Sequence, residues 1–180
     1  AGVGVDNIDI PTASECQIVV CNTPGASTSS VVELTIGHLI ASVRHIAKAD
    51  RTLRLGEWEK RSLRGSEIGG KRLGLIGYGR IARGVGEVAH TMGMELHAFD
   101  PYIAKELSTA PPCTLHDDVD ELFRLCTHIS IHCNLSPETH HLVNSERLSM
   151  MPGVGADGTA CGNHIVNCAR GGIVDEAAVL

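Results

Sequence analysis

Apolar and polar residues alternate along this chain in a pattern that predicts strands separated by helices. The clearest stretch is residues 71–100, KRLGLIGYGRIARGVGEVAHTMGMELHAFD. Within it, the apolar runs at 73–76 and 96–99 predict two short strands, and Ile81 to Met92 carries apolar side chains at helical spacing. Gly93 follows the helical stretch as a C-cap. This stretch therefore predicts a strand, a glycine turn, a helix and a second strand.

The same alternation continues on both sides of this unit. An apolar stripe from Val32 to Ala47, with Ser30 and Glu33 at capping-box spacing, predicts one long helix from Ser30 to about Leu55. Further strands are expected at 113–115, 127–132 and 165–168, and further helices at 118–126, at 145–150 and from Asp175 onward. This order predicts an α/β fold, a Rossmann-type doubly wound parallel sheet with helices on both faces.

Length and composition narrow the class of protein. The 180 residues are 43% hydrophobic with a formal net charge of −6, which indicates a globular chain with a sizeable core. The acidic balance argues against nonspecific nucleic-acid binding. The best apolar run, residues 34–43, is too short to cross a membrane and contains His38. Seven cysteines without a C-x-x-C pair predict buried free thiols in an intracellular, cytoplasmic protein.

Neither end of the chain resembles a natural domain boundary. The chain starts at Ala1 rather than at a methionine, and Leu180 lies inside a helical pattern. We therefore expect a piece of a longer protein. Short apolar runs in residues 1–28, broken by the Pro24-Gly25 turn, predict the last portion of another α/β unit.

The glycine turn has the spacing of a dinucleotide-binding fingerprint. Gly77 permits a tight turn, and Gly79 lets the backbone approach a pyrophosphate at the helix N-terminus. Ala82 stands at the third glycine position and still allows the helix to pack closely on the strand. Asp100, 23 residues past Gly77, is placed to accept hydrogen bonds from the adenine-ribose hydroxyls. Because its carboxylate would repel a 2′-phosphate, the expected cofactor is NAD rather than NADP.

Four motifs, in this order, resemble the D-isomer-specific 2-hydroxyacid dehydrogenases. They are AGVGVDNID at 1–9, NTPGAST at 22–28, GYGRIA at 77–82 and NCARGGIVDE at 167–176. The first and last of them, together with GEWE at 56–59, are most similar to the D-3-phosphoglycerate dehydrogenases of that family. The resemblance implies two α/β domains with the active site between them. Residues 1–28 would be the C-terminal part of a substrate-domain segment, and 29–180 an NAD-binding domain that is incomplete at its C-terminus.

The resemblance also implies roles for individual residues. Arg80 and Ile81 would contact the pyrophosphate, Cys133 would line the adenine side, and the backbone of Cys168 and Ala169 would face the nicotinamide. The full set of implied cofactor contacts is Val3, Gly77, Gly79, Arg80, Ile81, Asp100, Cys133, Cys168, Ala169 and Arg170.

Val3, Gly4 and Arg170 are the residues that the resemblance places against substrate. Arg170 matches the family's catalytic arginine, whose planar guanidinium pairs with a substrate carboxylate through two hydrogen bonds. The family's acid/base histidine and its glutamate occur C-terminal to this arginine motif, beyond Leu180. None of the ten histidines of the chain therefore receives a catalytic role, and His132 is expected to be structural.

The implied activity is hydride transfer between NAD and a D-2-hydroxy acid, with 3-phosphoglycerate of serine biosynthesis as the favoured substrate and a homodimer or homotetramer as the assembly. Two alternatives stay open. Asn134 replaces the family's usual proline, and HCNL at 132–135 with HHLVN at 140–144 resembles the C-terminal-binding-protein corepressors, which bind NAD but recruit peptides. A glyoxylate or hydroxypyruvate reductase would differ only in its substrate.

A further departure from the family pattern is an apparent insertion at residues 155–163. Its glycine, alanine and threonine content predicts a flexible loop. The side chains of Asp157, Cys161 and His164 are of types that bind metals. Their loose spacing is weak support for a metal site. We therefore expect no metal.

Overall fold

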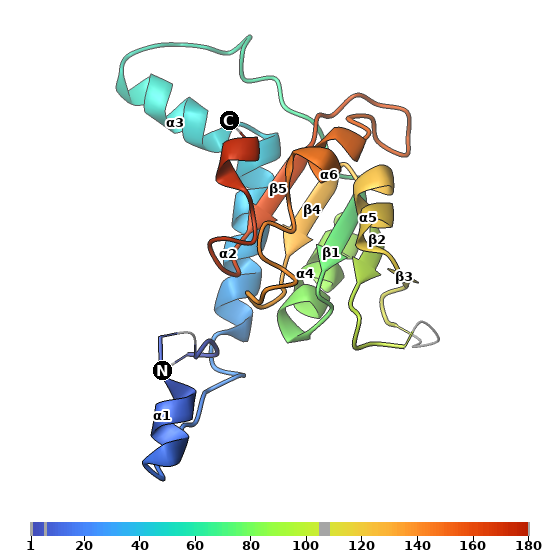
Figure 1. Cartoon of the computed structure of the whole chain (residues 1–180). Coiled ribbons are helices and arrows are strands. Elements are labelled where there is room, and N and C mark those ends of the chain that lie inside the picture. The colour runs from blue at the N-terminus through green and yellow to red at the C-terminus, as the bar shows by residue number, and fades with distance from the viewer. Residues whose placement is uncertain (1, 6, 105–108, 180) are drawn as a thin grey trace.

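Five parallel strands form one sheet in the order β3-β2-β1-β4-β5 (Figure 1). This arrangement comes from a computed structural model that describes residues 2–5, 7–104 and 109–179. The strands are β1 (Arg72–Ile76), β2 (Glu95–Phe99), β3 (Cys113–His116), β4 (His128–Ile131) and β5 (His164–Asn167). The strand order reverses direction between β1 and β4, as in Rossmann domains. The predicted fold class is confirmed.

Helices cover both faces of the sheet. On one face lie α2 (Thr28–Val43) and α4 (Arg80–Thr91), and on the other lie α5 (Val119–Leu125) and α6 (Ser145–Met150). Leu73 and Leu75 of β1 point into the first core, whereas Ile76 points into the second. Side chains of a strand alternate between its two faces, so the central strand must be apolar throughout. This explains why the run at 73–76 showed no polar position.

The long helix expected from Ser30 to Leu55 is two helices, so that prediction was wrong. α2 ends at Val43, and α3 (Ile46–Arg54) begins after His45, whose φ of 55° lies in the left-handed region. A left-handed residue interrupts the hydrogen-bond pattern of a right-handed helix. Ser27 is the N-cap of α2, and Ser30 therefore lies inside the helix rather than at its cap.

The other predicted elements lie within two residues of their observed bounds, with one exception. The helix expected from Asp175 onward is a single 3-10 turn, η1 (Glu176–Ala178), among the residues that the structure describes. The side chain of Asp175 caps it by accepting a hydrogen bond from the N–H of Ala177. The last residue of the predicted helix, Leu180, lies outside the described residues.

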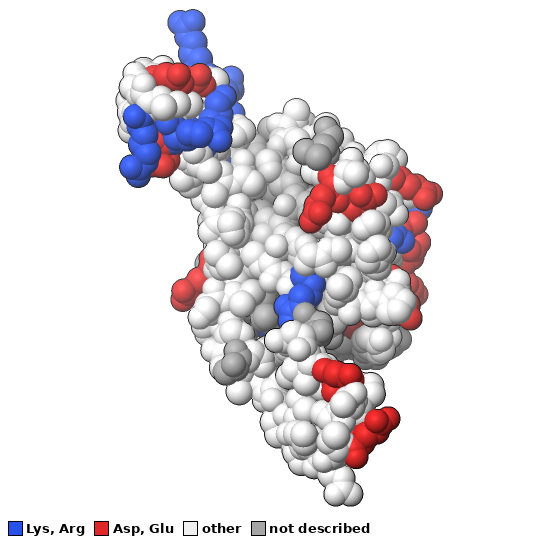
Figure 2. All heavy atoms as spheres, turned by 60° about the vertical axis from the view of Figure 1, so that its left-hand side comes forward, with Lys and Arg blue, Asp and Glu red and all other residues white. Residues whose placement is uncertain are grey.

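α3 and the segment after it project away from the sheet (Figure 1). Residues 44–64 carry seven basic and three acidic side chains, in a chain whose net charge is −6. Figure 2 shows lysine and arginine gathered on this projecting lobe. Leu55 and Trp58 of the same lobe are 70% and 81% exposed. The lobe therefore combines positive charge with uncovered apolar side chains.

Residues 2–27 lie apart from the sheet, on the side where its strands end (Figure 1). The described part of this segment contains one short helix, α1 (Ile10–Glu15). The two ends of the segment lie side by side, because the N–H of Thr23 donates to the carbonyl of Gly2 at 2.9 Å. Ile18 and Val19 are 60% and 85% exposed, so this segment has an apolar face that the described chain does not cover.

The insertion at residues 155–163 is anchored to the domain. The N–H of Gly155 donates to the carbonyl of Thr159 at 2.9 Å, and Asp157 Oδ2 lies 2.6 Å from Lys71 Nζ. The Lys71 side chain is only 3% exposed, and its hydrogen bond to Asp157 lowers the pKa of that carboxyl. Gly155 crosses the stem of Lys71 so closely that an added Cβ would lie 2.3 Å from Lys71 Cδ. The composition of the insertion gave no indication of this anchoring.

The cysteines are less buried than the sequence predicts. All seven are free thiols, but only Cys126 is buried, and Cys16 and Cys21 are exposed. The expectation of buried thiols was therefore wrong for these two positions, which lie in the segment that stands apart from the core. In the described part of the chain, no helix combines the length and the apolar character needed to cross a bilayer.

Candidate cofactor and substrate site

The predicted site residues follow the carboxyl ends of four neighbouring strands. Ile76 of β1 is in register with Phe99 of β2 and with Ile131 of β4, and Ile131 is in register with Asn167 of β5. Parallel strands in register end at the same edge of the sheet. That edge is lined by Gly77, Asp100, Cys133 and Cys168 to Arg170. Open α/β sheets bind their ligands here, at the point where the strand order reverses.

The two glycines of the turn differ in what surrounds them. Gly77 has a φ of +83°, and an added Cβ would lie 3.0 Å from the backbone of His132 and Cys133. Gly79, the N-cap of α4, has a φ of −80°, and an added Cβ would meet nothing within 4 Å. The fold itself therefore requires glycine at 77 but not at 79. The open space at Gly79 is what a pyrophosphate needs in order to reach a helix N-terminus.

Arg80 and Ile81 are the first two residues of α4. The first N–H groups of a helix have no partner within it, and they carry the positive end of the helix dipole. Arg80 is exposed, whereas the half-buried Ile81 packs against the core between the sheet and α2. The N–H groups at the start of α4 can therefore receive an anion at the turn, and the exposed Arg80 side chain is accessible to it.

Asp100 is joined to the glycine turn by its side chain. Its Oδ2 accepts a hydrogen bond from the N–H of Tyr78 at 2.8 Å, and its Oδ1 accepts one from the N–H of Tyr102 at 2.9 Å. An ionised carboxylate has about four lone-pair sites, so two remain for other donors. The half-buried Asp100 can therefore hold the turn and accept bonds from a ribose diol at the same time.

Tyr78 is a residue whose role sequence reasoning missed. Its buried ring lies under the guanidinium of Arg83, whose Cζ is 5.2 Å from the ring centroid, and Arg83 Nε donates to the Tyr78 carbonyl at 3.1 Å. Burial raises the pKa of the Tyr78 hydroxyl to about 12. Tyr78 thus connects the glycine loop at 77–79 to the N-terminal end of α4. The only signal in the sequence was an aromatic residue between the two glycines.

The segment after β5 is a tight turn organised by Asn167. Its Oδ1 accepts a hydrogen bond from the N–H of Ala169 at 3.0 Å, and its Nδ2 donates to the carbonyl of Arg170 at 2.8 Å. Arg170 Nη1 donates to the carbonyl of Ala169 at 2.8 Å. Cys168 packs against the core on the α2 and α4 side, and Ala169 against the core on the α5 side. These contacts therefore fix the backbone conformation from which the half-buried Arg170 side chain extends.

The chain that follows Arg170 is held by the chain that follows β4. The N–H of His141 donates to the carbonyl of Gly172 at 2.8 Å, and the N–H of Val143 donates to that of Ile173 at 3.1 Å. Gly172 has a φ of +77° and lies against His140. These two segments are far apart in sequence, and their pairing limits the conformations available to the arginine turn.

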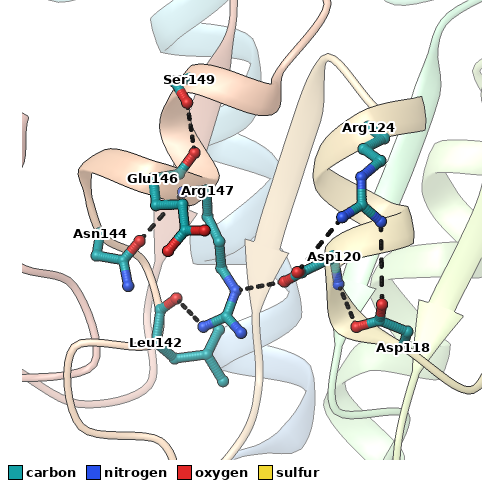
Figure 3. Close-up of polar contacts among 8 residues, drawn as sticks. All are labelled: Asp118, Asp120, Arg124, Leu142, Asn144, Glu146, Arg147 and Ser149. Atoms are coloured by element: carbon teal, nitrogen blue, oxygen red, sulfur yellow. Dashed lines mark hydrogen bonds and ion pairs between the residues drawn. The ribbon is translucent and has the colours of Figure 1, made fainter.

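A polar network connects this pairing to α5 and α6 (Figure 3). Arg147 of α6 donates to the carbonyl of Leu142 at 2.7 Å and to Asp120 Oδ1 of α5 at 2.8 Å. Arg124 lies 3.6 Å from Asp120 Oδ2 and 3.9 Å from Asp118 Oδ2, so α5 presents both acids to arginines. The network holds Leu142 beside α5 and thereby supports the strand-like segment that pairs behind Arg170.

His132 and Cys133 end β4 at the same edge. His132 Nε2 lies 2.9 Å from Ser130 Oγ, and burial lowers the pKa of His132 to about 4. The imidazole is therefore neutral near pH 7, as suits a structural residue. Burial also raises the pKa of the half-buried Cys133 thiol, which stays protonated.

Val3 and Gly4 lie in the N-terminal segment, on the side of the domain where the strands end (Figure 1). Both are exposed, and the carbonyl of Val3 accepts a hydrogen bond from Asn22 Nδ2 at 3.1 Å. Asn22 begins the NTPGAST motif, so the first two family motifs meet in space. The site residues predicted from sequence thus fall into two groups, one in the N-terminal segment and one at the carboxyl edge of the sheet.

The three side chains considered as metal ligands do not converge. Asp157 pairs with Lys71, and His164 Nε2 lies 3.1 Å from the backbone carbonyl of Cys161. Within residues 2–5, 7–104 and 109–179, no group of three or more His, Cys, Asp or Glu is placed to hold a metal ion. A cavity of about 510 Å³ lies beside them, at the amino edge of the sheet. Its lining includes the Lys71–Asp157 ion pair together with Arg64 and Glu67.

The chain matches the family model described as "D-isomer specific 2-hydroxyacid dehydrogenase, NAD binding domain" over residues 36–180. It is 42% identical over 179 residues to D-3-phosphoglycerate dehydrogenase of Methanocaldococcus jannaschii, which covers 99% of this chain and 33% of that protein. It is 45% identical over 179 residues to hydroxypyruvate reductase of Thermotoga maritima, with 99% and 55% covered.

A solved structure agrees with this relationship. D-lactate dehydrogenase from Aquifex aeolicus, crystallised with NAD and lactic acid, is similar with a TM-score of 0.82 at 28% identity, over 99% of this chain and 51% of that one. The chain spans about a third of the length of the M. jannaschii relative and about half that of the other two. By sequence and by fold, it belongs to the D-isomer-specific 2-hydroxyacid dehydrogenase family and contains the NAD-binding domain of that family.

Proposed function

We propose that this chain is the NAD-binding part of a dehydrogenase that transfers a hydride between a D-2-hydroxy acid and NAD. The observation that carries the proposal is the alignment of the glycine turn, Asp100 and the arginine turn along one edge of the sheet. Residues 29–180 are assigned to the NAD-binding domain and residues 1–28 to a segment of the substrate domain. The exposed apolar face at Ile18 and Val19 supports this division, because it needs a covering domain.

NAD, when bound, supplies the acceptor for the hydride. The residues of this chain bind and orient it: Gly79 and the N-terminus of α4 receive the pyrophosphate, with Arg80 and Ile81 in contact. Asp100 accepts from the adenine ribose, and Cys133 lines the adenine side. The backbone of Cys168 and Ala169 faces the nicotinamide end. The open space at Gly79 and the two remaining acceptor sites of Asp100 support this fit.

Arg170 is the catalytic residue that we assign to this chain. Its guanidinium holds the substrate carboxylate through two parallel hydrogen bonds and fixes the carbon that carries the hydroxyl toward the nicotinamide. Val3 and Gly4 present backbone groups to substrate from the other side. By the family resemblance, a histidine C-terminal to the arginine motif takes the hydroxyl proton with the help of a glutamate.

The substrate that we favour is 3-phosphoglycerate, as in serine biosynthesis. The M. jannaschii relative, named as a D-3-phosphoglycerate dehydrogenase, supports this choice. The second candidate is a hydroxypyruvate reductase, because the T. maritima relative of that name is slightly more identical, at 45% against 42%. A corepressor-like NAD sensor has the sequences at 132–135 and 140–144 in its favour.

A substrate panel on the full-length protein tests these candidates. NADH formation from 3-phosphoglycerate, glycerate and lactate is measured at alkaline pH, and NADH consumption with hydroxypyruvate at neutral pH. We expect the highest kcat/KM with 3-phosphoglycerate. A preference for glycerate and hydroxypyruvate would select the reductase. NADH binding without turnover of any of these acids would contradict the enzyme and favour the sensor.

We further propose that the protein forms a homodimer, or a homotetramer built from two such dimers, through α2, α3 and the segment after α3. The projecting lobe at 44–64 supports this, because Leu55 and Trp58 are largely exposed on it and its basic residues complement an otherwise acidic chain. Sedimentation at micromolar concentration measures the mass. A monomer under these conditions would contradict the assembly.

A further inference from the structure

Asn167 is the last residue of β5, and both polar atoms of its side chain bind the turn that carries Arg170. Its Oδ1 accepts from the N–H of Ala169 at 3.0 Å, and its Nδ2 donates to the carbonyl of Arg170 at 2.8 Å. We propose that Asn167 is a positioning residue that sets the direction in which Arg170 leaves the sheet edge. This inference rests on the proposed function, in which Arg170 holds the substrate carboxylate.

The backbone position of Asn167 is fixed by the sheet and does not depend on its side chain. It is in register with Ile131 of β4, so its backbone belongs to the sheet. The residue itself is exposed, and its side chain therefore adds little to the packing of the core. What the side chain provides is a connection from the end of the strand to the second and third residues beyond it. Such side-chain bonds to nearby backbone are characteristic of asparagine in turns.

The chemistry of the amide matters because the turn needs an acceptor and a donor from one side chain. Asparagine supplies both on a short stem, whereas aspartate supplies acceptors only. In Asn167→Asp, Ala169 keeps its partner, but a carboxylate oxygen would face the carbonyl of Arg170. That oxygen would also attract the guanidinium that is meant for substrate. Asn167→Ala removes both bonds and leaves no new charge.

The position of the Arg170 side chain depends on the conformation of this turn, through both its backbone and its guanidinium. Its Nη1 donates to the carbonyl of Ala169 at 2.8 Å, and the N–H of Ala169 is bound by Asn167, so the guanidinium is attached to a residue that Asn167 holds. Cys168 and Ala169 pack into cores on opposite faces of the sheet. A rotation of the turn would therefore displace the guanidinium. A misplacement of about 1 Å can cost about 100-fold in rate.

Asn163 offers a matched control at the opposite end of the same strand. Its Oδ1 accepts from the N–H of Gly153 at 2.9 Å, and its Nδ2 donates to the carbonyl of Met151 at 3.4 Å. Like Asn167 it is exposed and bridges two backbone groups. It does so at the amino edge of the sheet, away from Arg170. Asn163→Asp therefore imposes the same chemical change without touching the arginine turn.

The experiment compares Asn167→Ala, Asn167→Asp and Asn163→Asp in the full-length protein. The readouts are kcat and KM for the preferred 2-hydroxy acid, the Kd of ADP-ribose and Tm. We expect kcat/KM to fall by about 100-fold in both Asn167 variants, with ADP-ribose binding and Tm unchanged. Asn163→Asp should match the wild type. Unchanged kcat/KM in the Asn167 variants, or an equal loss of ADP-ribose affinity, would overturn the positioning role.

A second readout separates this inference from the proposed function. If the wild type turns over no 2-hydroxy acid, the proposed function fails, and hydrogen exchange at the Ala169 amide still reports on the turn. Faster exchange in Asn167→Ala but not in Asn163→Asp would support the hold of Asn167 on the turn. Equal protection in all three proteins would overturn it.

Discussion

The carboxylate of Asp100 accepts a hydrogen bond from the backbone N–H of Tyr78 at 2.8 Å, which joins the end of β2 to the glycine turn after β1. The residue expected to read the adenine ribose is therefore also part of the loop expected to receive the pyrophosphate. Tyr78 is in turn bound by Arg83 of α4 through its carbonyl and its ring. Hydrogen bonds thus join Asp100, the glycine turn and the start of α4. A substitution at Asp100 should therefore alter the conformation of the turn.

Replacing Asp100 should change the choice between NAD and NADP. The wild type is expected to bind NADH far more tightly than NADPH, because a 2′-phosphate beside the carboxylate brings like charges together. Asp100→Ser should weaken NADH binding by about 10- to 100-fold, since hydrogen bonds to a charged group are lost. The same change should narrow the difference between the cofactors.

Fluorescence titration of the full-length protein measures both Kd values. Asp50→Asn is the control, because Asp50 is an exposed acid on α3 that pairs with Arg54 at 2.9 Å. It should leave both affinities as they are. Equal affinity of the wild type for NADH and NADPH would contradict the role given to Asp100.

The two glycines of the turn should respond in opposite ways to alanine. Gly77→Ala forces a side chain onto a φ of +83° and within 3.0 Å of the backbone at His132 and Cys133, which should cost about 1–3 kcal/mol of stability. Gly79→Ala should lower Tm much less, because its Cβ meets nothing and only the N-cap preference for glycine over alanine is lost. It should nevertheless weaken NADH binding, because the methyl group occupies the space assigned to the pyrophosphate. Wild-type NADH affinity in a stable Gly79→Ala protein would show that the cofactor does not pass there.

The parts of the fold that rest on local patterns were predictable from the sequence. The apolar run 73–76 lies on the central strand because both faces of that strand are buried, and Asp100 follows its neighbour because register aligns Ile76 with Phe99. The glycine turn could be predicted from local sequence alone, because the φ of +83° at Gly77 is a conformation that favours glycine. The order of strands and helices then determined which residues share the carboxyl edge.

The features that sequence reasoning missed depend on contacts between distant residues or on a single dihedral angle. His45 adopts a left-handed conformation between two helices whose apolar stripes are continuous, so no periodicity marks the break. Lys71 and Asp157 are 86 positions apart, and nothing in either neighbourhood indicates their pairing. Asn167 was part of a recognised motif, but its two bonds to the arginine turn follow from geometry that spacing alone does not give.

His128 should make stability depend on pH below neutrality. It is fully buried, stacks on His164 at 4.9 Å between ring centroids, and lies 2.8 Å from Thr127 Oγ1 through Nδ1. Burial lowers its pKa from 6.5 to about 4. Between pH 4 and 6.5, His128 is protonated in the unfolded chain and neutral in the folded chain. The free energy of unfolding therefore has its full value above pH 6.5 and decreases as the pH falls toward 4. The loss from His128 should be about 2 kcal/mol at pH 5.

Denaturant unfolding from pH 7.5 to pH 4.5 measures this dependence. His128→Phe keeps a ring against His164 and removes the titrating group, so its stability should fall less steeply on acidification. His90→Gln, a change at an exposed histidine of α4, should keep the wild-type slope. Identical slopes in all three proteins would mean that His128 accepts a proton in the folded state.

Arg170, held at the carboxyl edge beside the proposed NAD site, is the residue that we expect to grip the carboxylate of a D-2-hydroxy acid. This role is tested by steady-state kinetics of Arg170→Lys in the full-length protein, with Arg72→Lys as a control, because Arg72 pairs with Glu95 at the opposite, amino edge of the sheet. An ammonium keeps the charge but cannot form the two parallel hydrogen bonds, so kcat/KM for the acid should fall by about 10- to 100-fold. The Kd of ADP-ribose, which lacks the nicotinamide, should stay the same. Arg72→Lys should behave as the wild type. Unchanged kcat/KM in Arg170→Lys would show that Arg170 does not hold the substrate carboxylate.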